Sequence, residues 1–78
     1  MSRVIHFEIH AGDPGRAATF YRRVFGWDIQ KVPEMDYWLA TTGPADQPGI
    51  NGAIMPRRGV VDGVAVIAYV CTIGVDDL

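Results

Sequence analysis

Three side chains that can bind a metal ion or accept a proton alternate along a short segment near the N-terminus. They are His6, Glu8 and His10, in the sequence Val-Ile-His-Phe-Glu-Ile-His. Imidazole and carboxylate groups are ligands that divalent zinc, iron, nickel or manganese accept in proteins. On a strand, residues two apart are separated by roughly 6.7 Å and residues four apart by roughly 13 Å. His6 and Glu8 could therefore share one ion, whereas His6 and His10 are not expected to do so.

Glu8 has two further interpretations. It could act as a general base if its surroundings were dry enough to raise its pKa, because proton abstraction from carbon needs a carboxylate close to the substrate. It could instead line a polar cup, in which it hydrogen-bonds His6 or water. The residues themselves favour this polar lining over either chemical role.

The elements that would position these residues can be predicted from the spacing of apolar side chains. Strict alternation over residues 4–10 predicts a strand with His6, Glu8 and His10 on one face and Ile5, Phe7 and Ile9 on the other. Asp13 as N-cap, Pro14 at the first helical position and Gly26 as terminator predict a helix between them. That helix is expected to pack on the apolar strand face through residues at helical spacing, namely Ala17, Phe20, Tyr21 and Val24.

Three more strands are predicted over residues 27–32, 37–42 and 50–55, the first two joined as a hairpin. The result is an α+β unit of the order βαβββ. Alternation places Tyr37 and Trp38 on opposite faces of their strand, so only one of them can face a ligand. Trp38 and Asn51 complete the candidate ligand-binding residues, which also include His6, Glu8 and His10.

A fifth strand is predicted from residue 64 to residue 73, and its sequence repeats the opening pattern of the chain. The predicted organisation is a βαβββ module over 3–56, a linker over 57–63, and the start of a second module over 64–78. The fifth strand is apolar on both faces, with Cys71 as a packing thiol. An uncovered apolar strand is costly, so we expect a homodimer, formed by simple association or by strand exchange. The alternative is that the chain is a fragment of a longer protein.

The chain resembles the vicinal oxygen chelate superfamily of glyoxalases, bleomycin resistance proteins and extradiol dioxygenases. The residues that carry this resemblance are Arg3-Val4-Ile5-His6, Gly12-Asp13, Phe20-Tyr21, Val24-Phe25-Gly26-Trp27, Tyr37-Trp38 and Gly49-Ile50-Asn51-Gly52. The resemblance implies two paired βαβββ modules around a concave surface that holds a divalent metal or a ligand. It also implies that His6 occupies the first-strand metal position. The fourth strand, where metal-dependent members usually have glutamate, offers only Asn51, and Ala68 stands where a second module would repeat His6.

Composition excludes several classes of function. The net charge is −2, and the basic pairs lack interleaved aromatic residues, which argues against nucleic-acid binding. No apolar run is long enough to span a membrane, and one cysteine fits a reducing, cytoplasmic compartment. The resulting prediction is a protein that binds a small molecule in a β-sheet cup without a complete metal site. The alternatives are a metal-dependent lyase, isomerase or dioxygenase with His6 as a ligand to one divalent ion, and a truncated, self-associating module without activity.

Overall fold

The computed structural model describes residues 2–59 and 68–75, which form one helix and a single mixed sheet of five strands. In chain order the elements are β1 (Arg3–Ala11), α1 (Pro14–Phe25), β2 (Asp28–Lys31), β3 (Trp38–Thr41), β4 (Asn51–Pro56) and β5 (Tyr69–Gly74). This order confirms the predicted α+β class and the βαβββ unit followed by a further strand. Residues 64–67 of the predicted fifth strand and most of the predicted linker lie outside the described ranges, so those domain boundaries stay predictions.

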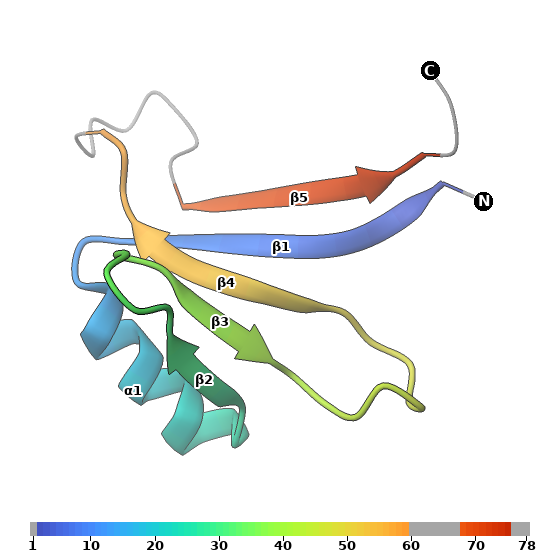
Figure 1. Ribbon diagram of the computed structural model, residues 1–78, viewed down its shortest axis with the longest axis horizontal. Helices are drawn as coiled ribbons and strands as arrows, with labels where there is room; N and C mark the ends of the chain where they lie inside the picture. The colour runs from blue at the N-terminus through green and yellow to red at the C-terminus, as the bar shows by residue number, and fades with distance from the viewer. Residues whose placement is uncertain (1, 60–67, 76–78) are drawn as a thin grey trace.

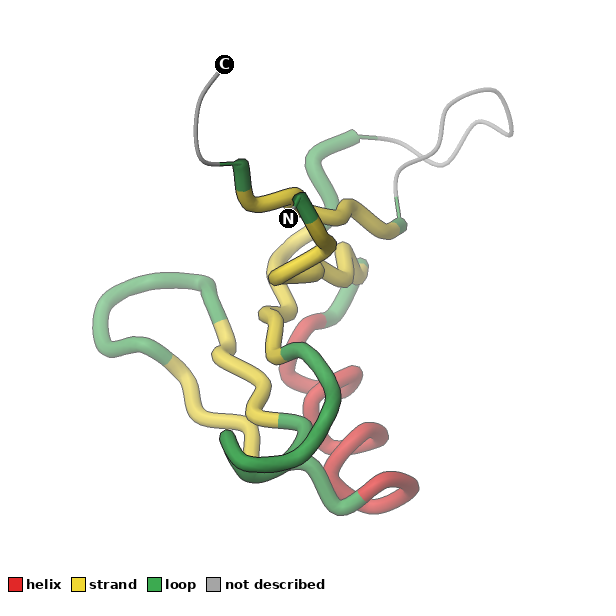
Figure 2. The backbone as a smooth tube through the Cα atoms, turned by 90° about the vertical axis from the view of Figure 1, so that its right-hand side faces the viewer, coloured by secondary structure: helices red, strands yellow, loops and turns green. Residues whose placement is uncertain are grey.

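The sheet has the strand order β2-β3-β4-β1-β5 (Figure 1). β1 runs parallel to β4 and antiparallel to β5, while β2 and β3 form the predicted antiparallel hairpin. The helix α1 lies on one side of the strands (Figure 2). Among the described residues, no helix packs on the opposite face, so the two faces of β1 have different environments.

Both predicted ends of α1 are confirmed. The Asp13 carboxylate accepts a hydrogen bond from the backbone N–H of Arg16 at 3.1 Å, and Pro14 begins the helix. Gly26 ends it in a left-handed conformation at φ 70°, a geometry that glycine adopts without steric cost. The helix has 12 residues, and nothing helical in the described ranges has the length and apolar character needed to cross a membrane.

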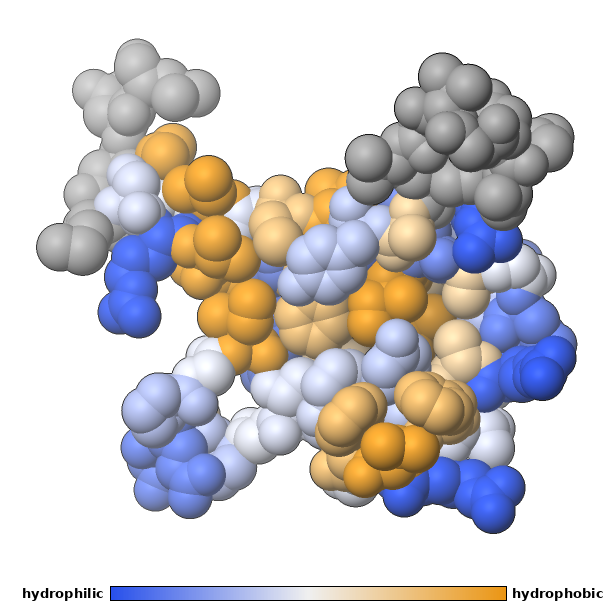
Figure 3. Space-filling model, turned by 180° about the vertical axis from the view of Figure 1, so that it is seen from behind, coloured by the Kyte–Doolittle hydropathy of each residue, from blue (hydrophilic) through white to orange (hydrophobic). Residues whose placement is uncertain are grey.

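The predicted buried face of α1 is wrong in part. Ala18 is fully buried against the sheet, whereas Phe20 and Val24 are more than half exposed. Ala17 and Tyr21 are half-buried and pack against the core, as expected. A small side chain at position 18 lets the helix backbone approach the sheet closely, and this turns Phe20 and Val24 outward. These two residues form an apolar patch on the outer side of the helix (Figure 3).

The core lies between α1 and the strands nearest to it. Its buried members come from the helix and from four strands, and they are Phe7, Ala18, Ile29, Ala40 and Ile54. An aromatic cluster closes one end, in which the rings of Tyr21 and Trp27 stack with their centroids 5.1 Å apart. The Arg22 guanidinium donates to the backbone carbonyl oxygen of Ile29 at 2.6 Å, which ties the helix to β2.

Gly52 is the point of closest approach within the sheet. It is the β4 partner of Phe7, and a Cβ added there would contact the Phe7 carbonyl oxygen and lie 2.6 Å from the Phe7 ring. No side chain fits at this position without a backbone shift. The glycine therefore allows the Phe7 ring to lie close against β4.

Ile5 does not join the core, although the strand pattern predicted that it would. The pairing of β1 with β5 is irregular between Val4 and His6, and Ile5 is 57 % exposed. A bulge breaks the alternation of side chains, so a residue within it need not follow the faces of its neighbours. Phe7 and Ile9 keep the predicted side of the strand and face the helix layer.

β5 contributes little to the core. The Tyr69 ring stacks on Phe7 with centroids 6.0 Å apart, but Tyr69 remains 49 % exposed. Cys71 is exposed, which corrects the prediction of a packing thiol. In the described residues no helix lies over β5, so its apolar side chains lack the cover that α1 gives to β1, β2 and β4. The homodimer predicted to cover this strand stays a prediction.

Candidate functional site

The face of the sheet away from α1 carries the polar residues of β1. His6, Glu8 and His10 alternate with the core residues Phe7 and Ile9, as predicted, and all three are half-buried. Their neighbours on β4 are Asn51, Ala53 and Met55, in that order. The candidate site therefore has polar side chains from β1 beside a small or apolar surface from β4.

Glu8 is paired with His10, not with His6. The distance from Glu8 Oε1 to His10 Nε2 is 3.7 Å, and the Tyr37 hydroxyl donates to Glu8 Oε2 at 3.4 Å. The two residues are two apart on β1, so their side chains share one face and can bridge the spacing of roughly 6.7 Å between them. Both distances exceed those of a short hydrogen bond, so neither contact holds the carboxylate tightly.

The surroundings of Tyr37 change the pKa of its hydroxyl. Partial burial raises the pKa of its hydroxyl above the ordinary value, and the neighbouring Glu8 carboxylate raises it further through its negative charge and its hydrogen bond. Tyr37 consequently stays a neutral proton donor towards Glu8 across the physiological range. The catalytic role predicted for Glu8 stays a prediction.

Trp38 lies on the other side of the sheet from Glu8, which corrects its placement among the residues of the candidate cup. Its β4 partner is Ile54, which is itself the partner of Ile9 on β1, so all three side chains face the helix layer. Trp38 packs against the core, and the Lys31 ammonium lies 5.5 Å from the centroid of its ring. Tyr37, one residue earlier, therefore projects towards the open face.

His6 lies at the edge of an open groove of about 710 Å³. The groove forms because pairing between β1 and β4 begins at His6 and Asn51, so the earlier residues of β1 separate from the loop before β4. Its polar lining includes Arg3, His6, Gln47 and Asn51, and its apolar lining is Val4, Ile5, Pro48 and Ile50. Of the predicted site residues, only His6 and Asn51 line this groove.

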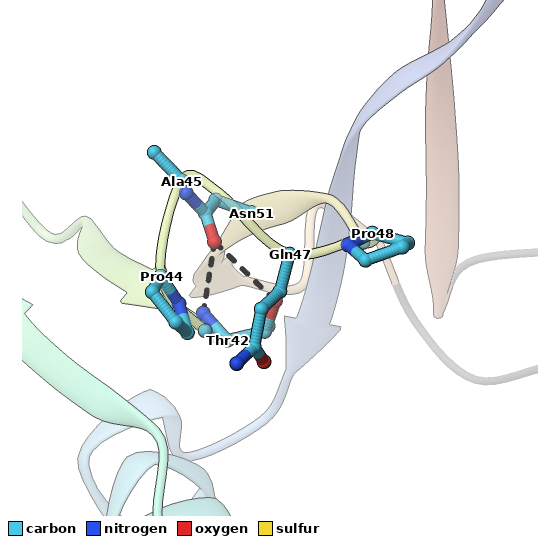
Figure 4. Close-up of a pocket in the computed structure, with 8 residues that line it drawn as sticks. Thr42, Pro44, Ala45, Gln47, Pro48 and Asn51 are labelled. Atoms are coloured by element: carbon cyan, nitrogen blue, oxygen red, sulfur yellow. Dashed lines mark hydrogen bonds between the residues drawn. The ribbon is translucent and has the colours of Figure 1, made fainter.

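Asn51 is engaged in holding a loop. Its Oδ1 accepts hydrogen bonds from the backbone N–H of Thr42 at 2.8 Å and from the Thr42 hydroxyl at 3.3 Å (Figure 4). The Thr42 hydroxyl has a single proton, and its shorter contact is with the Ile50 carbonyl oxygen at 2.6 Å, so the contact with Asn51 is the weaker branch of a shared hydrogen bond. The cavity enclosed by this loop measures about 140 Å³, which is small against the 300–1,000 Å³ typical of ligand sites.

The residues around His6 do not fit the metal site that the superfamily resemblance implies. The fourth-strand partner is an amide whose oxygen is already used by Thr42. Within residues 2–59 and 68–75, no cluster of three or more histidine, cysteine, aspartate or glutamate side chains could hold an ion. No chemistry is therefore assigned to a metal at His6.

Two features of this face were not predicted from the sequence. Tyr37 was recognised as one of two alternatives, but its face depends on the register of β3 with β4 and of β4 with β1. Arg3 and Gln47 join the groove because β1 and β4 diverge. The alternation of Tyr37 with Trp38 shows that their side chains lie on opposite faces of the strand. Only the assembled sheet shows which of the two faces the open side.

Comparison with known families places the N-terminal half of the chain in a described family. Residues 3–43 match a family model described as bleomycin resistance protein-like N-terminal, which covers β1, α1, β2 and β3. This match fits the resemblance to the N-terminal part of the vicinal oxygen chelate superfamily. A search of curated proteins found no match.

Proposed function

The chain belongs to the bleomycin resistance protein-like family through its N-terminal region, and from this membership we propose that the open face of its sheet binds a small molecule. Binding, rather than a metal-dependent reaction, is proposed because the donors around His6 do not make a metal site. The binding surface comprises the groove at His6 and the neighbouring side chains of Glu8 and Tyr37.

The observation that carries this proposal is the groove itself. Its volume of about 710 Å³ falls within the range of drug-sized ligand sites. Apolar walls with a few polar groups are the usual composition of such sites, since the walls provide affinity and the polar groups orient the ligand. Here aliphatic side chains share the lining with a comparable amount of polar surface, which comes from Arg3, His6, Gln47 and Asn51.

The ligand class follows from this lining. An amphipathic molecule with an apolar body and hydrogen-bonding substituents would match the aliphatic walls and the polar rim. Bleomycin is the first compound to test, because the matching family model bears its name. The proposal requires only the fold and the groove, and it invokes no bond-making step.

Titration with bleomycin, followed by backbone NMR shifts and by calorimetry, tests the proposal. We expect shift changes concentrated at the groove, and affinity lowered about two- to tenfold in His6→Ala, the effect of losing one hydrogen bond. Arg23→Ala is the matched control, because Arg23 lies on the exposed side of α1 and removes a charge from another surface. Shift changes confined to the outer side of α1, or no binding, would overturn the proposal.

A further inference from the structure

The groove at His6 carries charge of one sign. Among the described residues that line it, one side chain has a permanent charge, the Arg3 guanidinium, and none is a carboxylate. The acids nearest to the lining in the sequence are Glu8 and Asp46, and neither lines the groove. Glu8 lies further along β1 and accepts a hydrogen bond from Tyr37. The groove is therefore positively charged in a chain whose net charge is −2.

The polar groups that the groove offers to a ligand are rich in hydrogen-bond donors. A guanidinium has five N–H donors and no acceptor, so Arg3 can only donate. Asn51 already uses its Oδ1 to accept from the backbone N–H of Thr42, which leaves its amide NH₂ group to donate. An ionised carboxylate has the opposite character, because it accepts hydrogen bonds and donates none. A carboxylate therefore complements both the charge and the donors of this lining.

The apolar side of the groove favours a ligand with a hydrocarbon body. Val4 and Ile5 are exposed there, because the irregular pairing between Val4 and His6 leaves Ile5 outside the core. Pro48 and Ile50, from the segment that precedes β4, line the same groove. Covering such aliphatic surface is favourable in water and does not depend on charge. The apolar part of a ligand would provide affinity, and its polar group would provide selectivity.

We propose that the groove selects small monocarboxylic acids with an apolar body, and that Arg3 determines this preference. The inference rests on the proposed function, since it names the ligand class of the same groove. One guanidinium balances the charge of one carboxylate and can bind both of its oxygens through parallel N–H groups. A phosphate monoester carries close to two charges at neutral pH, so one guanidinium would leave part of that charge unbalanced. A cationic ligand is disfavoured by repulsion from Arg3.

Three probes with the same hydrocarbon chain test the preference: octanoate, octylamine and octan-1-ol. Backbone NMR shifts locate each probe, and calorimetry measures its affinity. Octanoate and octylamine both lose a charged group's hydration on binding, so their comparison isolates the sign of the charge. We expect octanoate to bind at the groove at least about three- to tenfold more tightly than octylamine. Added salt should weaken octanoate binding and leave octan-1-ol binding unchanged, because salt screens charge.

Substitution of Arg3 assigns the preference to one residue. Arg3→Gln should weaken octanoate binding about three- to tenfold and leave octan-1-ol binding nearly unchanged, a split that a purely structural role of Arg3 would not produce. Arg3→Glu should reverse the order of octanoate and octylamine. Arg23→Gln is the matched control, because it removes the same charge from the exposed side of α1 and should leave the binding of all three probes unchanged.

Two results would overturn the carboxylate preference alone. They are equal affinities for octanoate and octylamine, and an octanoate affinity that Arg3→Gln does not change. Groove shifts with octan-1-ol would in either case still support small-molecule binding there. Absence of groove shifts with all three probes would also overturn the preference, whereas the proposed function fails only if bleomycin leaves the groove unshifted too.

Discussion

Ile54 and Ile5 are the same residue type on adjacent strands of one sheet, yet their environments are opposite. Ile54 is fully buried beneath α1, whereas Ile5 is 57 % exposed where β1 pairs with β5. In the described residues, α1 covers one half of the sheet, where it contacts β1, β2 and β4, and no helix covers the half around β5. Burial here is determined by the element lying over the strand rather than by how apolar the strand is.

The largest expected effect that tests this comparison comes from truncating each isoleucine. Ile54→Ala should lower the free energy of unfolding by about 2–5 kcal/mol, because it leaves a cavity in a close-packed core. Ile5→Ala removes the same atoms from an exposed site and should cost less than about 1 kcal/mol. Urea denaturation measures both values. Equal losses would show that the two halves are equally buried in solution.

Glycine substitutions should sharpen the same contrast. Gly52→Ala places a Cβ against the Phe7 backbone and ring, so we expect a loss of about 1–3 kcal/mol or more from overpacking. Gly74→Ala is the matched control on β5. Its Cβ would lie 3.1 Å from Ile5 Cδ1, the end of a side chain that can move aside. A thermal unfolding series in which Gly74→Ala is the more destabilised variant would contradict this assignment.

The covered half was also the easier one to predict from the sequence. Local signals, such as the Asp13 and Gly26 caps and the alternation along β1, depend on neighbouring residues and could be recognised directly. The buried face of α1 could not, because apolar residues surround much of the helix. Ala18 is buried and Phe20 is not, because the helix lies so close to the sheet that a small side chain fits between them.

The site could be predicted to a similar extent. Alternation placed His6, Glu8 and His10 on one face correctly. The contact between Glu8 and His10 depends on side-chain rotation, which their spacing of roughly 6.7 Å along the strand does not fix. The choice of Tyr37 over Trp38 required the register of three strands, which is a property of the assembled sheet.

Association through β5 should alter the open half and leave the covered half unchanged. If a second copy covers β5, light scattering should give about twice the chain mass of 8.6 kDa. Ile73→Lys places a charge on a strand whose described residues carry none, and charges on an edge strand disfavour pairing between chains. This variant should be monomeric with a folded covered half. A wild-type protein that is already monomeric would rule out the homodimer.

The smallest expected effect concerns the pH dependence of stability. The pKa of Tyr37 is raised, so its neutral form is favoured in the folded protein, and the associated stability is fully present below about pH 10. That stability is lost as the pH rises through the raised pKa. Tyr37→Phe should therefore show a shallower decline in unfolding free energy as the pH rises above about 10, and so should Glu8→Gln. Identical slopes in wild type and both variants would contradict the assignment.

The position of β1 inside the sheet has a consequence for motion. β1 pairs on both edges, with β4 on one side and β5 on the other, and its pairing with β4 runs from His6 to Ala11. Amide protons along this stretch should exchange with solvent only through the costliest openings, while those of the short β2–β3 hairpin exchange through local fraying. The strand that carries both histidines and Glu8 would then be the slowest-exchanging part of the molecule, and a ligand would meet a surface whose backbone is already fixed.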